Sequence, residues 1–200
     1  RATGSNTVVV EDLFVPETRS IRQLDLVDGT CPGAAVNPGA LYRWPWVAYA
    51  PLTFAAPILG AAEGAYEDFR AAAARRRDSV GAPVAGRTAI QVGIGAAAAR
   101  LDAAALLLRR IAEQPEPPSL ELRARAMRDY PAACELIVAA LDALVALSGS
   151  SAFASSQPIQ RAWRDVHFAA SHHALGAEMN YGHFGRLALG LERLPGQDSF

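Results

Sequence analysis

Side chains that could carry chemistry gather in the last quarter of the sequence. One segment of about three helical turns holds a dense group of them: Arg161, Arg164, Asp165, His167, His172 and His173. On a helix, Arg161 and Asp165 are one turn apart and can form an ion pair. Asp165 and His172 are two turns apart and share one face. The plainest interpretation is a solvated arginine–aspartate network with a pair of helix histidines at a subunit contact.

Two kinds of site fit these residues poorly. His167 and His172 are five residues apart, which splays them on a helix, and no nearby cysteine completes a zinc ligand set. Ser171 lies beside His172, but neighbouring side chains on a helix point in different directions. No nucleophile-elbow glycine pattern surrounds that serine. We therefore expect neither a metal site nor a Ser–His–Asp hydrolase.

A second set of side chains could bind phosphate. The run Arg75, Arg76 and Arg77 offers planar forks of donors that match phosphate oxygens, and it equally suits the negative end of a helix dipole. The turn Ser148–Ser151 precedes a helix, so its backbone N–H groups could bind phosphate, or it could be an ordinary turn between helices. Five aromatic side chains could line a flat ligand or form core at a domain junction: Tyr42, Trp44, Trp46, Tyr49 and Phe54.

Composition and charge exclude several classes of function. Hydrophobic residues make up 51% of the chain, which excludes a disordered or fibrous protein. With 19 basic and 20 acidic side chains, the sequence has no basic footprint for nucleic acid or an anionic membrane surface. Cys31 and Cys134 supply neither a disulfide framework nor a zinc quartet, which favours a reducing cytoplasm. No uninterrupted apolar run approaches the ~18 residues that cross a bilayer, and we expect no membrane association.

The elements that must position these groups are mostly helices. Apolar periodicity and the placement of glycine and proline predict four long antiparallel helices, over residues 51–76, 87–113, 119–147 and 158–185. Pro131 should kink or split the third helix. Long helices with short connections predict an up-and-down four-helix bundle. The alanine- and leucine-rich arcs of the second and third helices exceed what one bundle needs to cover, which predicts self-association.

The chain before the helices is different in character. Residues 7–15 are rich in β-branched side chains and predict two short strands around an acidic turn. The chain begins at Arg1, and its opening is typical of the middle of a β-segment, so we expect a fragment of a longer protein. The predicted organisation is a β-segment over residues 1–26, a connecting loop over 27–50 and the helical bundle over 51–200.

Several segments, in their order along the chain, resemble the acyl-CoA dehydrogenase superfamily. Val10–Pro16 is similar to the phrase that closes the β-domain of that family. Arg77–Gly81 resembles its R-x-x-F-G motif, with valine for phenylalanine, and Gln91 resembles the glutamine that follows it. Ser148–Ala152 lies where the family has a glycine-rich turn, and Gln160–Asp165 resembles the R-x-x-R-D that opens its last long helix. The resemblance covers nearly the whole chain and implies the tail of the middle β-domain followed by a C-terminal bundle that closes over a flavin.

The last predicted helix narrows the resemblance to one subgroup. Where the dehydrogenases often carry a catalytic carboxylate, this sequence has His172 and His173. Trp163–His172 and Leu41–Pro45 look more like the two-component flavin-dependent monooxygenases on the same fold. This resemblance implies reduced flavin (FMN or FAD) from a separate flavin reductase, and transfer of one oxygen atom of O2 to an aromatic or similar small substrate.

The resemblance also implies roles for particular residues. His172 would lie near the reactive edge of the flavin and control a proton there, with His173 as the alternative. Arg43 would offer positive charge to the reduced flavin. The flavin phosphate, in a neighbouring subunit, would contact Arg77, Ser150 and Ser151. A homotetramer built as a dimer of dimers is implied as well. An acyl-CoA dehydrogenase-like oxidation of a thioester and a non-catalytic helical oligomerisation scaffold stay open as alternatives.

Overall fold

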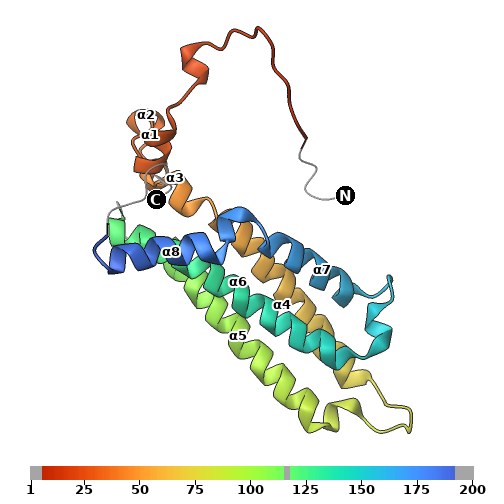
Figure 1. Cartoon of the computed structure of the whole chain (residues 1–200). Coiled ribbons are helices and arrows are strands. Elements are labelled where there is room, and N and C mark those ends of the chain that lie inside the picture. The colour runs from red at the N-terminus through yellow and green to blue at the C-terminus, as the bar shows by residue number, and fades with distance from the viewer. Residues whose placement is uncertain (1–5, 115–117, 192–200) are drawn as a thin grey trace.

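The body of the protein is made of helices. The computed structural model describes residues 6–114 and 118–191, and the regular elements within these ranges are all helical. Three long helices lie side by side (Figure 1): α4 (Leu52–Arg75), α5 (Thr88–Ala112) and α6 (Leu120–Ser148). Of two shorter helices, α7 (Pro158–Ala170) packs on α4 and α6, and α8 (Ala177–Ala188) packs on α6. The prediction of a mainly α-helical chain is confirmed.

The three long helices begin and end within one residue of the predicted bounds. Pro131 lies inside α6 and does not split it. Tyr130 and Ala133, on either side of the proline, are fully buried in the core. We infer that this packing offsets the hydrogen bond lost at an interior proline, which costs about 3 kcal/mol.

The prediction of one continuous fourth helix over residues 158–185 is wrong, because the chain is not helical throughout this range. α7 ends at Ala170 and α8 begins at Ala177, with one 3-10 turn between them. The backbone of His172 is extended there, with φ −61° and ψ 134°, and its ring accepts a hydrogen bond from the Ala174 N–H. Such a bond from a side chain to the nearby backbone competes with helix formation. Apolar periodicity does not reveal it.

The prediction of strands over residues 7–15 is also wrong for the described chain. These residues are exposed and form no strand, and Phe14 is 85% exposed. Figure 1 shows the segment extending away from the helical body. A β-branched pattern reports a preference for extended backbone, but a strand also needs a partner that accepts and donates its backbone hydrogen bonds. No described segment supplies that partner.

The segment just before α4 is a series of short helical turns: α1 (Gln23–Asp28), α2 (Gly33–Val36), a 3-10 turn (Ala40–Arg43) and α3 (Trp46–Tyr49). Gly29 has φ +71°, and a side chain there would collide with the Arg43 carbonyl oxygen, so this position requires glycine. The Tyr130 hydroxyl in α6 donates to the Ala48 carbonyl oxygen at 3.1 Å. This bond ties the end of the segment to the body.

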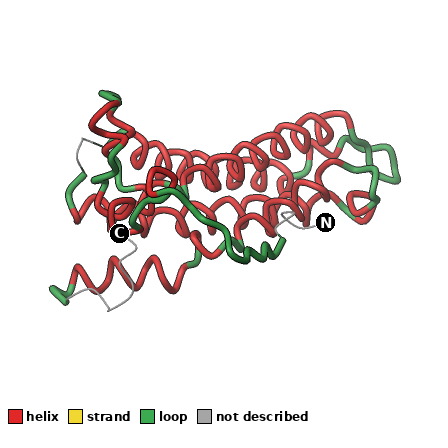
Figure 2. The backbone as a smooth tube through the Cα atoms, turned by 90° about the horizontal axis from the view of Figure 1, so that it is seen from above, coloured by secondary structure: helices red, strands yellow, loops and turns green. Residues whose placement is uncertain are grey.

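The core lies between the long helices, and Figure 2 shows them running alongside one another from a second direction. α5 and α6 make the largest contact. They approach closely at Gly93, where a Cβ would collide with the Leu147 side chain. The largest fully buried side chains include Ile111, Met127, Tyr130, Ile137, Leu141 and Leu144.

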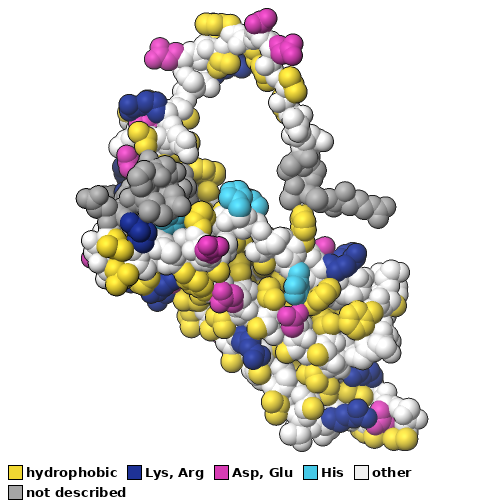
Figure 3. Space-filling view, viewed as in Figure 1, with side chains coloured by type: hydrophobic (Ala, Val, Ile, Leu, Met, Phe, Trp, Pro, Cys, Tyr) yellow, Lys and Arg dark blue, Asp and Glu magenta, His cyan; other side chains and the backbone are white. Residues whose placement is uncertain are grey.

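Apolar surface remains uncovered on α5. By length and composition, α5 and α6 could each cross a membrane, a weak signal that buried core helices also give. Half of the most apolar stretch of α6 is buried inside the protein, but only 22% of that of α5. Val92 and Leu106 on α5 are 63% and 64% exposed, and hydrophobic side chains are visible along the body in Figure 3. α5 therefore presents an apolar face with no partner among the described residues.

Candidate functional site

The candidate site is the turn between α7 and α8 together with the start of α4. The imidazole of His172 stacks on the Phe54 ring of α4, with ring centroids 4.3 Å apart and planes at 26°. His173 lies against the other histidine, with centroids 4.5 Å apart. His172 is half-buried, whereas His173 and Phe54 are exposed. Three flat side chains from two elements thus form a small aromatic patch that faces outward.

The hydrogen bonding of His172 determines which ring nitrogen carries its proton. Nδ1 accepts from the Ala174 backbone N–H at 3.2 Å. In a neutral imidazole one nitrogen accepts and the other donates, so the proton of neutral His172 lies on Nε2. The site therefore holds an N–H donor on a ring whose plane is set by Phe54.

The other polar residues of the predicted fourth helix form a different cluster. Asp165 does not share a helix with His172, and it is exposed on α7. Instead, the Oδ1 atom of Asp142, in α6, accepts a hydrogen bond from Trp163 Nε1 at 2.6 Å. The same oxygen lies 3.2 Å from His167 Nε2. Sequence analysis missed Asp142, since it belongs to a separate helix and no local pattern marks it.

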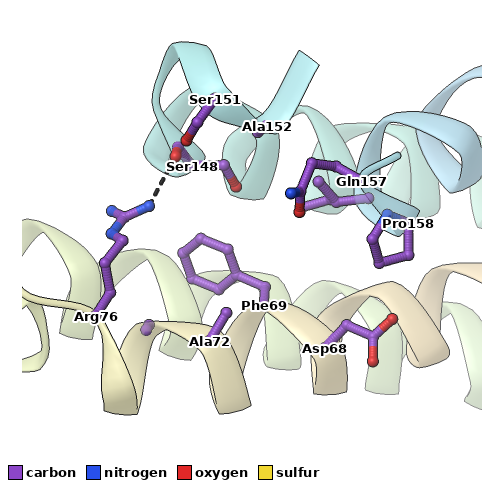
Figure 4. A pocket seen from close by; sticks show the side chains of 11 residues that line it. Asp68, Phe69, Ala72, Arg76, Ser148, Ser151, Ala152, Gln157 and Pro158 are labelled. Atoms are coloured by element: carbon purple, nitrogen blue, oxygen red, sulfur yellow. Dashed lines mark hydrogen bonds between the residues drawn. The ribbon is translucent and has the colours of Figure 1, made fainter. Parts of the chain in front are cut away.

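Arg76, rather than Arg77, reaches the serine turn. Its Nη1 donates to the Ser148 carbonyl oxygen at 2.7 Å, and its Nη2 donates to the Leu147 carbonyl oxygen at 3.2 Å. Figure 4 shows Arg76 extending from α4 toward Ser148. Arg77 donates to Gly81 within its own turn. Arg76 therefore supplies charge to the carbonyl end of α6, and the Arg77 side chain is bonded elsewhere.

A cavity of about 170 Å³ lies between α4, the serine turn and the start of α7 (Figure 4). Its polar lining is Asp68, Arg76, Ser148, Ser151 and Gln157. Ser150 and Ser151 are both exposed. The volume is below the ~300 Å³ at which pockets begin to enclose a whole small molecule.

The remaining predicted site residue, Arg43, belongs to the short turns before α4. Its Nη1 donates to the Pro38 carbonyl oxygen at 3.1 Å, and the side chain is exposed. A second depression, of about 340 Å³, lies at the opposite end of the long helices and was not predicted. It is lined by Leu106, Arg109, Arg110, Glu113, Gln114 and Arg125.

The buried Cys134 is a poor nucleophile. Burial raises the pKa of its thiol to about 11, and the nearby Glu135 acts in the same direction. The thiolate that nucleophilic chemistry requires is therefore scarce at neutral pH. Within the described ranges, no group of three or more potential metal-ligating side chains comes together.

Comparison with known proteins places these features in context. The family described as acyl-CoA dehydrogenase, C-terminal domain, matches residues 52–176, from the start of α4 to the turn before α8. The chain is 38% identical over 204 residues to the flavin-dependent monooxygenase, oxygenase subunit HsaA, of Mycobacterium tuberculosis. That match covers 96% of this chain and 51% of the relative.

Two solved structures have the same fold over nearly the whole chain. The 3-HSA hydroxylase from Rhodococcus sp. RHA1 has a TM-score of 0.89 at 34% identity, covering 99% of this chain and 52% of that one. XiaF from Streptomyces sp., in complex with FADH2 and glycerol, has a TM-score of 0.76 at 29% identity and covers 96% and 50%. The chain thus spans about half the length of the relatives that it matches.

Proposed function

Because this chain belongs to the acyl-CoA dehydrogenase C-terminal domain family, we propose that it is the C-terminal half of the oxygenase component of a two-component flavin-dependent monooxygenase. The observation that carries the proposal is the 38% identity to an oxygenase subunit over 96% of the chain. The whole protein would transfer one oxygen atom of O2 to an aromatic or similar small substrate. A separate flavin reductase would supply the reduced flavin.

The aromatic patch formed by Phe54, His172 and His173 fits a flavin. It offers three flat rings, of which that of Phe54 is apolar, beside an N–H donor, which suits a planar ring system with polar edges. XiaF was solved with FADH2, which favours reduced FAD over FMN. When bound, the reduced flavin supplies the electrons that activate O2.

His172 would act on protons at this site. Its Nδ1 is occupied by the Ala174 N–H, so Nε2 is the atom that donates to an oxygen of the reacting group. Phe54 packs against the ring and limits its rotation. The exposed His173 is the alternative bearer of this role, since its ring lies against that of His172.

The residues proposed for the flavin phosphate are Arg77, Ser150 and Ser151, and Arg43 is proposed to face the reduced ring. Arg76 supports this arrangement indirectly, since it holds the Leu147 and Ser148 carbonyl oxygens of the turn. The Ser150 and Ser151 side chains are exposed and accessible to a ligand from a neighbouring subunit.

The organisation of the whole protein follows from the same proposal. Residues 1–26 would complete a middle β-domain whose other strands pair with the exposed segment 7–15, residues 27–50 would connect the domains, and residues 51–200 would form the up-and-down bundle. The protein would work in the cytoplasm as a dimer of dimers.

The decisive experiment supplies the whole protein with reduced FAD or FMN, O2 and a panel of phenolic substrates. The expected result is a hydroxylated product and oxidised flavin that dissociates readily. A tightly held FAD that oxidises an acyl-CoA thioester would instead support the dehydrogenase alternative. A protein that binds neither flavin and forms no product would support the oligomerisation scaffold.

A further inference from the structure

The side chain of Asn180 in α8 is a buried amide that the proposed function does not use. It is 0% exposed. Its Nδ2 donates to the Ala174 carbonyl oxygen at 3.1 Å and to the Gly176 carbonyl oxygen at 2.9 Å. Both acceptors belong to the turn that separates α7 from α8. Because a buried amide is costly unless it is hydrogen-bonded, these two bonds hold the turn against α8.

Ala174 connects Asn180 to His172. Its carbonyl oxygen accepts from Asn180 Nδ2, and its N–H donates to His172 Nδ1 at 3.2 Å. Leu175, next along the chain, is 2% exposed and anchors the turn in the core. Asn180 thus holds Ala174, and the Ala174 N–H is the group that selects the His172 tautomer.

Position 180 uses the two donors of the amide rather than its acceptor. Two carbonyl oxygens can be satisfied only by the –NH2 group, which also settles the orientation of the amide. The Asn180 Oδ1 is buried with no hydrogen-bond partner, an arrangement that has a cost. A carboxylate or an aliphatic side chain would leave the Ala174 carbonyl oxygen without this donor, and the Gly176 carbonyl oxygen would keep only the backbone N–H of residue 180, at 3.2 Å.

We propose that Asn180 is a positioning residue for His172: it holds the His172–Gly176 turn so that the Ala174 N–H occupies Nδ1 and the imidazole proton stays on Nε2. The part of this inference that concerns oxygen transfer rests on the proposed function. The part that concerns the tautomer stands on the hydrogen bonds alone. Asn180 acts through His172 and makes no contact with the reacting atoms.

The first test reads the tautomer directly and needs no activity. The chain has four histidines, so ¹⁵N-histidine labelling gives a simple spectrum, in which His172→Gln identifies the His172 signals. At alkaline pH, in the spectrum of the neutral rings, the Nε2–H form of His172 should dominate. A dominant Nδ1–H form in the wild type overturns the inference, whether or not any variant folds.

Asn180→Leu keeps the number and branching of the side-chain heavy atoms and removes both donors. His172 should then shift toward a mixture of tautomers while the other histidine signals keep their positions. The matched control is Asn37→Leu, since Asn37 Nδ2 also donates to a carbonyl oxygen, that of Gly33 at 2.9 Å, in a distant segment. Unchanged His172 signals in a folded Asn180→Leu protein overturn the inference. If this variant does not fold, Asn180→Asp, which also lacks the donors, replaces it.

The second test uses the whole protein with reductase, flavin and O2, and measures the product formed per flavin oxidised. Asn180→Leu should lower this coupling about tenfold, less than the ~10²-fold loss expected on removing a general acid–base group, with an unchanged KM for reduced flavin. A shifted tautomer with wild-type coupling would overturn the role of Asn180 in the reaction. Activity that is absent in the wild type would count against the proposed function and leave the tautomer result intact.

Discussion

At the scale of single residues, His172 is distinguished by its surroundings. Four histidines occur in the chain, but His172 combines a stacked ring, an occupied Nδ1 and partial exposure. His167 instead lies beside Asp142 and the Trp163 ring. Residue type alone does not separate these histidines, whereas their contacts do.

We predict that His172→Ala in the whole protein lowers hydroxylation by about 10²–10⁴-fold, the usual contribution of a general acid–base group. Peroxide release should rise, and the melting temperature should barely move, because the ring is only half-buried. Product and peroxide are measured together with flavin supplied in reduced form. His167→Ala serves as the control and should keep wild-type coupling. Loss of coupling in His173→Ala, with His172→Ala unaffected, would transfer the role to His173.

The raised pKa of Tyr49 predicts that the free energy of unfolding depends on pH in the alkaline range. Burial raises its pKa to about 12 from 10.0, against the opposing charges of Arg123 and Arg125. Its hydroxyl donates to Gln114 Oε1 at 2.5 Å. The unfolded chain therefore loses this proton at lower pH than the folded protein. The resulting stabilisation is fully present below pH 10 and is lost as the pH rises toward 12.

Urea unfolding at several pH values should show this loss in the wild type. Tyr49→Phe should give a shallower decline between pH 10 and 12, since it removes one of the groups responsible. Cys134 and Tyr181 also have raised pKa values, at about 11 and 12, so part of the slope should remain. An identical slope in the variant would contradict the assignment to Tyr49.

At the scale of elements, Arg76 joins the end of α4 to the end of α6, whereas its neighbours Arg75 and Arg77 do not make these bonds. Arg76 bonds to the α6 carbonyl oxygens, whereas Arg77 bonds to Gly81 in the following turn. Neighbouring residues of one type therefore serve different purposes. Arg76 has extended backbone directly after α4 ends at Arg75, and Arg77 belongs to the turn that follows.

This difference predicts opposite phenotypes for the two arginines. Arg76→Ala should lower the melting temperature, since it leaves the Leu147 and Ser148 carbonyl oxygens without this donor. Arg77→Ala should leave the melting temperature nearly unchanged but weaken reduced-flavin binding by the whole protein roughly tenfold, as expected for losing a charged hydrogen bond worth about 1.5 kcal/mol. Thermal unfolding and flavin titration separate the two effects. Unchanged flavin binding in Arg77→Ala would contradict the proposal that Arg77 binds the flavin phosphate.

At the scale of the whole molecule, two surfaces lack a partner among the described residues. The extended segment 7–15 exposes β-branched side chains, and α5 exposes Val92 and Leu106. An exposed apolar face of this kind marks a contact with another surface. We propose that strands of the longer protein cover the first surface and that another copy of the chain covers the second.

We predict that the double variant Val92→Glu, Leu106→Glu reduces the mass of the whole protein in light scattering from a tetramer to a smaller species. Burying two carboxylates in an apolar contact is costly, because charge must leave water without a counter-ion. Val36→Glu is the control, since Val36 is also exposed, at 79%, but lies outside α5. A wild-type mass equal to one subunit would contradict self-association itself.

Much of the architecture could be predicted from the sequence, because helix formation depends on the residues within a short stretch of chain. Apolar periodicity together with Gly81 and Pro83 predicts where α4 ends and α5 begins, and Pro158 predicts the start of α7. Five short segments in their order along the chain, the R-x-x-R-D segment among them, carried the resemblance to the family, and the histidines after that segment indicated the subgroup. His172 and His173 were also found this way, although their role stays a prediction.

Only the tertiary structure brought Phe54 against His172, Asp142 against Trp163, and Arg76 against the serine turn. These contacts join separate helices, and they depend on how the helices rotate and dock, which no local pattern encodes. The break before α8 and the unpaired segment 7–15 were mispredicted for a related reason. A helix or strand preference is a property of a short stretch, but a side-chain bond such as that of His172, or the absence of a partner strand, decides whether the preference is realised.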